Sequence, residues 1–159
     1  MTRRQQAVPD RLVGPVLPYE EFRLEDIEQS IPDRFEEQVA RYPDHLSVKS
    51  RHYEYTYRQL NALANQIARA ILERIAPHLE EGIGTYPEPV GVLLESDAPA
   101  VAAILGILKV GRAYVPLEPS LPHDRLAHHV RDSTASLLIT DGEYLALAEA
   151  IAQPRTQLV

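Results

Sequence analysis

Short apolar runs alternate with helix-length segments from Val90 onward, and this alternation restricts the fold more than any other feature of the sequence. Continuous apolar runs are typical of strands buried on both faces, whereas longer amphipathic segments favour helices. Right-handed crossovers through such helices lay the strands parallel in one sheet, with helices on both faces. The expected strands are 90–94, 113–117 and 137–140, and the expected helices are 96–110, 122–131 and 143–151.

The pattern predicts an α/β fold, a partial doubly wound and mainly parallel sheet with flanking helices. We expect the three strands to lie side by side. Ser96 is expected to cap the first of the three helices. Gly111 is placed to end that helix, because glycine accepts the left-handed conformation that closes many helices.

The first half of the chain contains the signals of a capped helix. Ser30 and Asp33 form its start, Phe35 and Val39 would be its buried stripe, and Pro43 ends it, because a residue before proline avoids the helical region. Residues 1–29 hold three prolines and no sustained period, so we expect a lead-in segment there. The predicted domain begins at residue 30.

A second capping box, Thr56 with Gln59, precedes a helix with a clear apolar face. Two short strands, 46–48 and 53–55, come before it, and a loop rich in proline and glycine, 77–89, follows it. Its expected apolar face consists of Leu60, Leu63, Ala64, Ile67, Ala68, Ile71 and Leu72.

The composition excludes several classes of partner. The net charge of −7 opposes binding to nucleic acid, and the absence of cysteine excludes disulfides and thiolate metal sites. The most apolar stretch, 98–108, is about half the length of a membrane span, and the first residues lack the apolar core of a secretory signal. We therefore expect a cytoplasmic protein with no nucleic-acid or membrane partner.

Two segments carry a family resemblance. Tyr55-Thr56-Tyr57-Arg58-Gln59-Leu60-Asn61-Ala62-Leu63-Ala64-Asn65 resembles the first core motif of the adenylation domains of nonribosomal peptide synthetases. Leu108-Lys109-Val110-Gly111-Arg112-Ala113-Tyr114-Val115-Pro116-Leu117-Glu118-Pro119 resembles the second and is the more specific match. The resemblance runs from about residue 30 to residue 140.

The resemblance implies that residues 30–159 are an incomplete adenylation (AMP-binding type) domain, the front part of the large N-terminal subdomain of an adenylate-forming enzyme. Such a ligase uses ATP and Mg to convert an amino or other carboxylic acid to an acyl-adenylate, which then passes to a carrier-protein thiol. The family's phosphate loop, nucleotide contacts and catalytic lysine would lie in a downstream segment. We therefore expect no cofactor on this segment alone and no activity from it.

No residue of either motif is an obvious acid, base, nucleophile or metal ligand, so catalytic and metal-binding residues are not predicted. Lys109 has two interpretations, a ligand contact or a favourable charge at a helix end. Glu118 stands where the family usually has Asp. The motif residues expected to be structural are Tyr55, Thr56, Tyr57, Leu60, Lys109, Gly111, Ala113, Tyr114 and Pro116.

Two other hypotheses remain open at this stage. The chain could be a non-catalytic, truncated or split-gene module that docks on a partner chain. It could also be an independent nucleotide-binding domain, although no glycine-rich loop follows any expected strand to receive phosphates. An incomplete sheet would leave an unpaired edge, through which self-association is expected.

Overall fold

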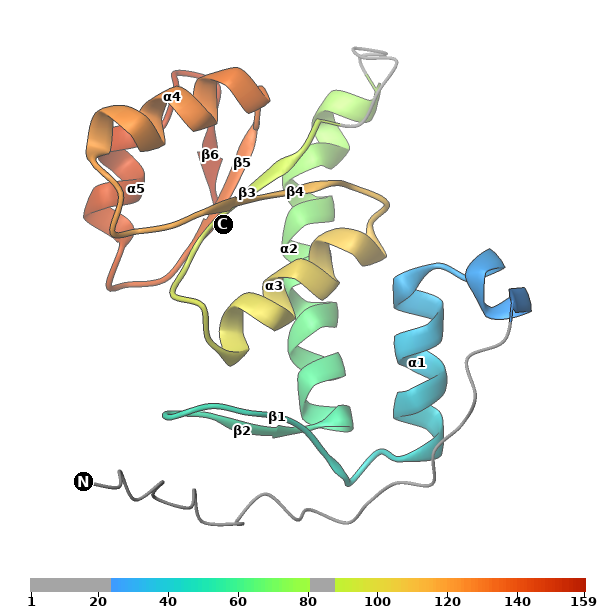
Figure 1. Ribbon diagram of the computed structural model, residues 1–159. Helices are drawn as coiled ribbons and strands as arrows, with labels where there is room; N and C mark the ends of the chain where they lie inside the picture. Colours follow the sequence, from blue (N-terminus) through green and yellow to red (C-terminus); the bar gives the residue numbers. More distant parts are fainter. Residues whose placement is uncertain (1–23, 81–87) are drawn as a thin grey trace, which may run out of the picture.

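The computed structural model describes residues 24–80 and 88–159, which contain two sheets and the helices that pack on them (Figure 1). A 3-10 helix, η1, spans Leu24–Glu28. The α-helices are α1 (Ile31–Arg41), α2 (Tyr57–Glu80), α3 (Ala98–Lys109), α4 (His123–Ser133) and α5 (Leu145–Ile151). The strands are β1 (Leu46–Lys49), β2 (Glu54–Thr56), β3 (Val90–Leu93), β4 (Tyr114–Leu117), β5 (Leu137–Thr140) and β6 (Gln157–Leu158).

The main sheet has the strand order β4-β3-β5-β6, and all three of its pairings are parallel. Val90 at the start of β3 lies beside Tyr114 of β4 and beside Leu137 of β5. The three expected strands are therefore adjacent, and the predicted α/β fold class is confirmed. Strand β6 was not predicted, because two residues are too few to show a period.

Helices cover both faces of this sheet (Figure 1). On one face, α2 and α3 pack on a buried cluster, and on the other face α4 and α5 pack on a second one. Alternation along the strands divides the two sets. The α2/α3 cluster contains Ile71, Ile75, Val90, Val92, Ala103, Ile107, Leu137 and Ile139. The α4/α5 cluster contains Leu93, Leu117, Leu126, Val130, Leu138, Ala148 and Ile151.

The outer edge of β4 contains a proline. The Val90 N–H donates to the Ala113 carbonyl at 2.9 Å, so Ala113 and every second residue after it direct their backbone groups toward β3. Pro116 is out of phase with this series, and its nitrogen therefore lies on the outer edge. The missing N–H costs the sheet no hydrogen bond there, and it denies a donor to any strand that approaches.

The first half of the chain packs against the α2/α3 pair. Strands β1 and β2 form an antiparallel hairpin, and a third cluster joins it to α1, α2 and α3. Both predicted caps of this region are confirmed. The Asp33 N–H donates to the Ser30 hydroxyl at 3.2 Å, and Thr56 and Gln59 exchange two bonds, of 2.9 and 3.3 Å. The cluster contains Leu60, Ala64, Ala102 and Leu105, with Phe35, Val48, Tyr55, Leu63 and Ile67 beside it.

Several local predictions were wrong. Asp97, not Ser96, caps α3, because its carboxylate accepts a 2.6 Å bond from the Ala98 N–H. Helix α2 continues to Glu80 through Pro77, which stands in its last turn and so removes only one helix bond. Leu72 was placed on the buried face of α2 but is 46% exposed.

Other expectations were met in part. Phe35 and Val39 face inward but are only half-buried, because α1 lies at the margin of the molecule. The last two helices begin one or two residues later than expected, at His123 and Leu145. Most of the expected lead-in segment, 1–23, and most of the loop 77–89 lie outside the described residues, so the boundary at residue 30 stays a prediction.

Helices α2 and α3 cross at a glycine. A Cβ atom on Gly106 would lie 2.9 Å from the Ala64 carbonyl oxygen and 2.9 Å from Cγ2 of Ile67. Both distances are shorter than side chains tolerate, so any larger residue would push the two helices apart. The α2/α3 layer therefore depends on the absence of a side chain at this position.

Gly106→Val should destabilise the protein by about 1–3 kcal/mol, the usual cost of overfilling a packed interior. Thermal or denaturant unfolding would measure it. Gly142→Val is the matched control, because a Cβ at Gly142 meets no atom within 4 Å. Equal stability of the two variants would contradict the close packing of α2 on α3.

Gly111→Val should cost about 1 kcal/mol or more, for a reason of conformation instead of space. Gly111 has φ of +70° and ends α3 as expected, with its N–H bonded to Leu108 and the next N–H, of Arg112, bonded to Ile107. No atom lies within 4 Å of an added Cβ, so a clash cannot explain the loss. An unchanged unfolding midpoint would show that α3 does not need this left-handed residue.

Candidate functional site

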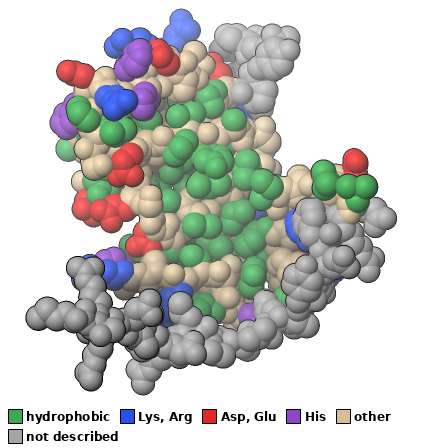
Figure 2. Space-filling model, viewed as in Figure 1, with side chains coloured by type: hydrophobic (Ala, Val, Ile, Leu, Met, Phe, Trp, Pro, Cys, Tyr) green, Lys and Arg blue, Asp and Glu red, His purple; other side chains and the backbone are tan. Residues whose placement is uncertain are grey.

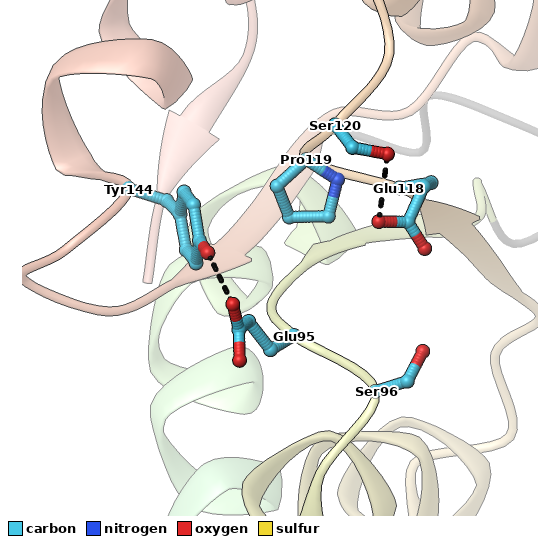
Figure 3. Close-up of a pocket in the computed structure, with 6 residues that line it drawn as sticks. All are labelled: Glu95, Ser96, Glu118, Pro119, Ser120 and Tyr144. Atoms are coloured by element: carbon cyan, nitrogen blue, oxygen red, sulfur yellow. Dashed lines mark hydrogen bonds between the residues drawn. The ribbon is translucent and has the colours of Figure 1, made fainter.

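The carboxyl ends of three parallel strands surround a shallow pocket of about 390 Å³ (Figure 3). Loops that follow neighbouring parallel strands meet at one edge of the sheet, which is where α/β proteins commonly bind ligands. The loop after β3 supplies two lining residues, the loop after β4 three, and the loop after β5 one. They are Glu95, Ser96, Glu118, Pro119, Ser120 and Tyr144.

A hydrogen bond joins the loops after β3 and β5. The Tyr144 hydroxyl donates to Glu95 Oε1 at 2.9 Å across the pocket (Figure 3). Asp141 positions the tyrosine, because its Oδ1 accepts the N–H groups of Glu143 at 3.0 Å and Tyr144 at 3.1 Å. The bond to Glu95 raises the pKa of Tyr144 to about 12. The neutral phenol is therefore held as a donor to the carboxylate.

The other side of the pocket is formed by the turn after β4. Ser120 donates its hydroxyl to Glu118 Oε1 at 3.2 Å, and the Leu121 N–H closes the turn on the Glu118 carbonyl at 3.0 Å. Figure 3 shows Glu118 and Ser120 opposite the pair of Glu95 and Tyr144. The glutamate at the family's aspartate position thus has a local partner within its own turn.

The N-terminus of α3, next to this pocket, already has an acidic partner. Asp97 accepts the Ala98 N–H, and a hydrogen bond with the Ser50 side chain, followed by that backbone bond, holds the pKa of Asp97 below its usual value. Ser50 lies between β1 and β2, so the hairpin tip reaches the start of α3. A carboxylate therefore occupies the position that an anion would take at this helix end.

The described residues at this edge do not suit the phosphates of ATP. Glu95 and Glu118 line the pocket, and Asp97 and Asp141 lie beside it, so like charges would repel a polyphosphate. Within 24–80 and 88–159, no three His, Cys, Asp or Glu residues are grouped so that they could hold a metal ion. The pocket supplies carboxylate and hydroxyl acceptors, which suit donors or cations and not anions.

The residues of the first motif lie at the junction of the hairpin and α2. Tyr55 is half-buried, and burial raises the pKa of its phenol. Thr56 caps α2, and Leu60 is 2% exposed in the cluster that joins α2 to α3. Tyr57 was expected in the strand but is the first residue of α2, where its ring packs 6.1 Å from that of Phe35.

The residues of the second motif lie at the end of α3 and along β4. Lys109 stands in the last turn of α3, and its ammonium group pairs with Glu36 of α1. Gly111 ends the helix, and the Ala113 carbonyl accepts the first bond from β3. Tyr114 and Pro116 are exposed on β4. None of these residues lines the pocket, and their expected structural role stays a prediction.

The sequence analysis did not select Glu95 and Tyr144. Each follows a strand of the main sheet, Glu95 after β3 and Tyr144 after β5. A rule that selects polar side chains just after neighbouring parallel strands would have found both. The pairing itself requires knowing that β3 and β5 are neighbours, although β4 intervenes in the chain.

Histidines and long apolar helices do not form further sites in the described part of the chain. His128 pairs with Asp132 at 3.1 Å one helix turn away, and the rings of His128 and His129 are 6.5 Å apart. No described helix is both long enough and apolar enough to cross a membrane.

Solved structures share this fold. The nonribosomal peptide synthetase FmoA3 bound to α-methyl-L-serine-AMP superposes with a TM-score of 0.70 at 27% identity, over 82% of this chain and 14% of that one. The anthranilate CoA ligase AuaEII in complex with anthranoyl-AMP superposes with a TM-score of 0.65 at 25% identity, over 82% of this chain and 25% of that one. The fold is that of the N-terminal subdomain of adenylate-forming enzymes.

Sequence comparison agrees with the fold. The family described as AMP-binding enzyme matches residues 35–159, and the chain belongs to that family. Bacitracin synthase 1 of Bacillus licheniformis is 37% identical over 132 residues, and Surfactin synthase subunit 1 of Bacillus subtilis (strain 168) is 34% identical over 168. The matches cover 82% and 94% of this chain but only 2% and 4% of those proteins. The predicted resemblance to the N-terminal portion of an adenylation domain is confirmed.

The bond between Tyr144 and Glu95 gives a titration that can be measured. An NMR titration of carbon-labelled tyrosine should show one phenol with a pKa of about 12, whose resonance disappears in Tyr144→Phe. Glu95→Gln should move this pKa down toward the ordinary value of about 10, because the ionised phenol no longer faces a carboxylate. Tyr53→Phe is the control and should leave this titration in place. A Tyr144 pKa near 10 in the native protein would contradict the pairing.

Proposed function

We propose that the chain is part of an ATP-dependent ligase that activates an amino or other carboxylic acid as an acyl-adenylate. The observation that carries the proposal is the family match over residues 35–159, on a fold shared with enzymes solved in complex with acyl-AMP. The match favours this activity over the non-catalytic docking module and over an independent nucleotide-binding domain. By family, pyrophosphate is the other product.

Residues 1–159 act in this proposal as scaffold. The acidic pocket at the carboxyl edge does not suit a polyphosphate, and the motif residues are occupied in caps, strands and an ion pair. We therefore assign the nucleotide contacts, and any Mg that accompanies ATP, to a downstream segment of the adenylation domain. Residues 30–159 would be the front of that domain, and the activity would require both parts.

The proposed partner that receives the acyl group is a carrier-protein thiol, in the cytoplasm where ATP is supplied. One structural neighbour is an artificially fused adenylation and carrier di-domain, NpsA-ThdA from Klebsiella oxytoca, with a TM-score of 0.63 and 20% identity. That likeness supports the fold alone. The proposal of a carrier partner depends on the family relationship.

Self-association through a sheet edge stays a prediction, and both edges limit it. Pro116 removes a donor from the outer edge of β4. At the other edge, the outward carbonyl of Leu158 in β6 already accepts a 2.5 Å bond from Arg74. Strand addition would meet a missing donor at one edge and an occupied acceptor at the other.

Purified residues 1–159 should show no amino-acid-dependent exchange of pyrophosphate into ATP. Stabilising the charge that develops at the α-phosphate needs preorganised donors or a cation, each worth several kcal/mol, and the described residues offer acids at this edge instead. Adding the downstream part of an adenylation domain should restore exchange. Exchange by residues 1–159 alone, with contaminating synthetases excluded, would contradict the proposal.

A further inference from the structure

Helix α3 is apolar around its whole circumference. Its twelve residues include one charged side chain, Lys109, and that side chain is only 8% exposed and pairs with Glu36 of α1. A helix that is hydrophobic on all sides is normally buried on all sides. One side of α3 is instead open in the described structure.

The open side is a stripe at helical spacing. Val101 is 39% exposed, and Ile104 and Leu108, three and seven residues further on, are half-buried on the same side. The remaining sides of α3 pack on α2 and on the sheet through Ala102, Ala103, Leu105 and Ile107. The stripe therefore has no cover among the described residues.

The outer part of β4 extends this stripe. Val115 and Leu117 point into the α4/α5 cluster, so Tyr114 and Pro116, which alternate with them, point to the α3 side. Tyr114 is 40% exposed. Hydrophobic side chains gather over the middle of the face in Figure 2, where α3 and β4 lie in Figure 1. We call Val101, Ile104, Leu108, Tyr114 and Pro116 the α3–β4 surface.

We propose that the α3–β4 surface is the docking face for the downstream segment of the same adenylation domain, an inference that rests on the proposed function. The match covers 30% of the chain of the Klebsiella oxytoca NpsA N-terminal subdomain, so most of such a subdomain lies outside the matched region. A continuous apolar surface with an exposed aromatic ring is the kind of face that a domain core covers.

The chemistry of the surface specifies its partner. It offers no charged group, because the one charge on α3 is neutralised by α1, so the segment that covers it must present an uncharged, apolar face. A second copy of this chain fits less well. Each copy carries a net charge of −7, and two copies would repel each other.

The test mixes residues 1–159 with a separately expressed probe, the part of Bacitracin synthase 1 that follows the matched 132 residues within its adenylation domain. Calorimetry should show one-to-one binding, weakened about 10- to 100-fold by Val101→Lys, the loss expected for one buried aliphatic side chain. Leu145→Lys is the matched control, because Leu145 is 44% exposed but lies on α5. It should change the affinity by less than about twofold.

Val101→Thr keeps the shape of the side chain and guards against misfolding of the lysine variant. It should keep the circular dichroism and unfolding midpoint of the native chain while still weakening binding. Absent binding, binding that ignores Val101→Lys, or a homodimer disrupted by Val101→Lys would each overturn the proposal.

Pyrophosphate exchange in the same mixtures separates this proposal from the proposed function. Exchange that is restored and ignores Val101→Lys would overturn the docking face and leave the ligase function intact. Binding that is sensitive to Val101→Lys, without any exchange, would support the docking face and count against the ligase function.

Discussion

The crossing of α2 over α3 is the constraint on which the other layers depend. At Gly106 the two backbones approach so closely that a Cβ would lie 2.9 Å from the Ala64 carbonyl oxygen. This approach lets α2 and α3 share one buried cluster with β3 and β5, and a second cluster with α1 and the hairpin. If the helices separated, both clusters would open together. The parallel sheet and the hairpin are thus held in one unit through a single small residue.

The sequence was sufficient for features that depend on local chemistry. The caps at Ser30 and Thr56 and the helix end at Gly111 were predicted, because each uses hydrogen bonds within four residues. The three parallel strands were predicted from continuous apolar runs. Predictions failed where two neighbouring residues offered the same chemistry, as at Ser96 and Asp97, since both can cap a helix and only packing decides between them.

The candidate site could not be predicted to the same degree, because it depends on contacts distant in sequence. Glu95 and Tyr144 are 49 residues apart and meet only because β5 inserts beside β3 instead of beside β4. No periodicity encodes that choice. Lys109 shows the same limit, since its position in the last turn of α3 was evident while its partner, Glu36, lies 73 residues away. Composition gave the charge of the edge, but only strand order gave its arrangement.

Polarity is distributed over this fold in a way that separates two roles. Carboxylates and hydroxyls gather where strands end, while α3 and the outer part of β4 carry aliphatic and aromatic side chains. An isolated protein has little reason to keep an uncharged helix at its surface, because about 25 cal/mol is lost for each Å² of apolar area left in water. A layer inside a larger subdomain recovers that free energy on its second face. The same arrangement explains why the acidic edge lacks phosphate contacts: a layer that supplies packing to its neighbour can leave the nucleotide chemistry to the residues that the neighbour brings.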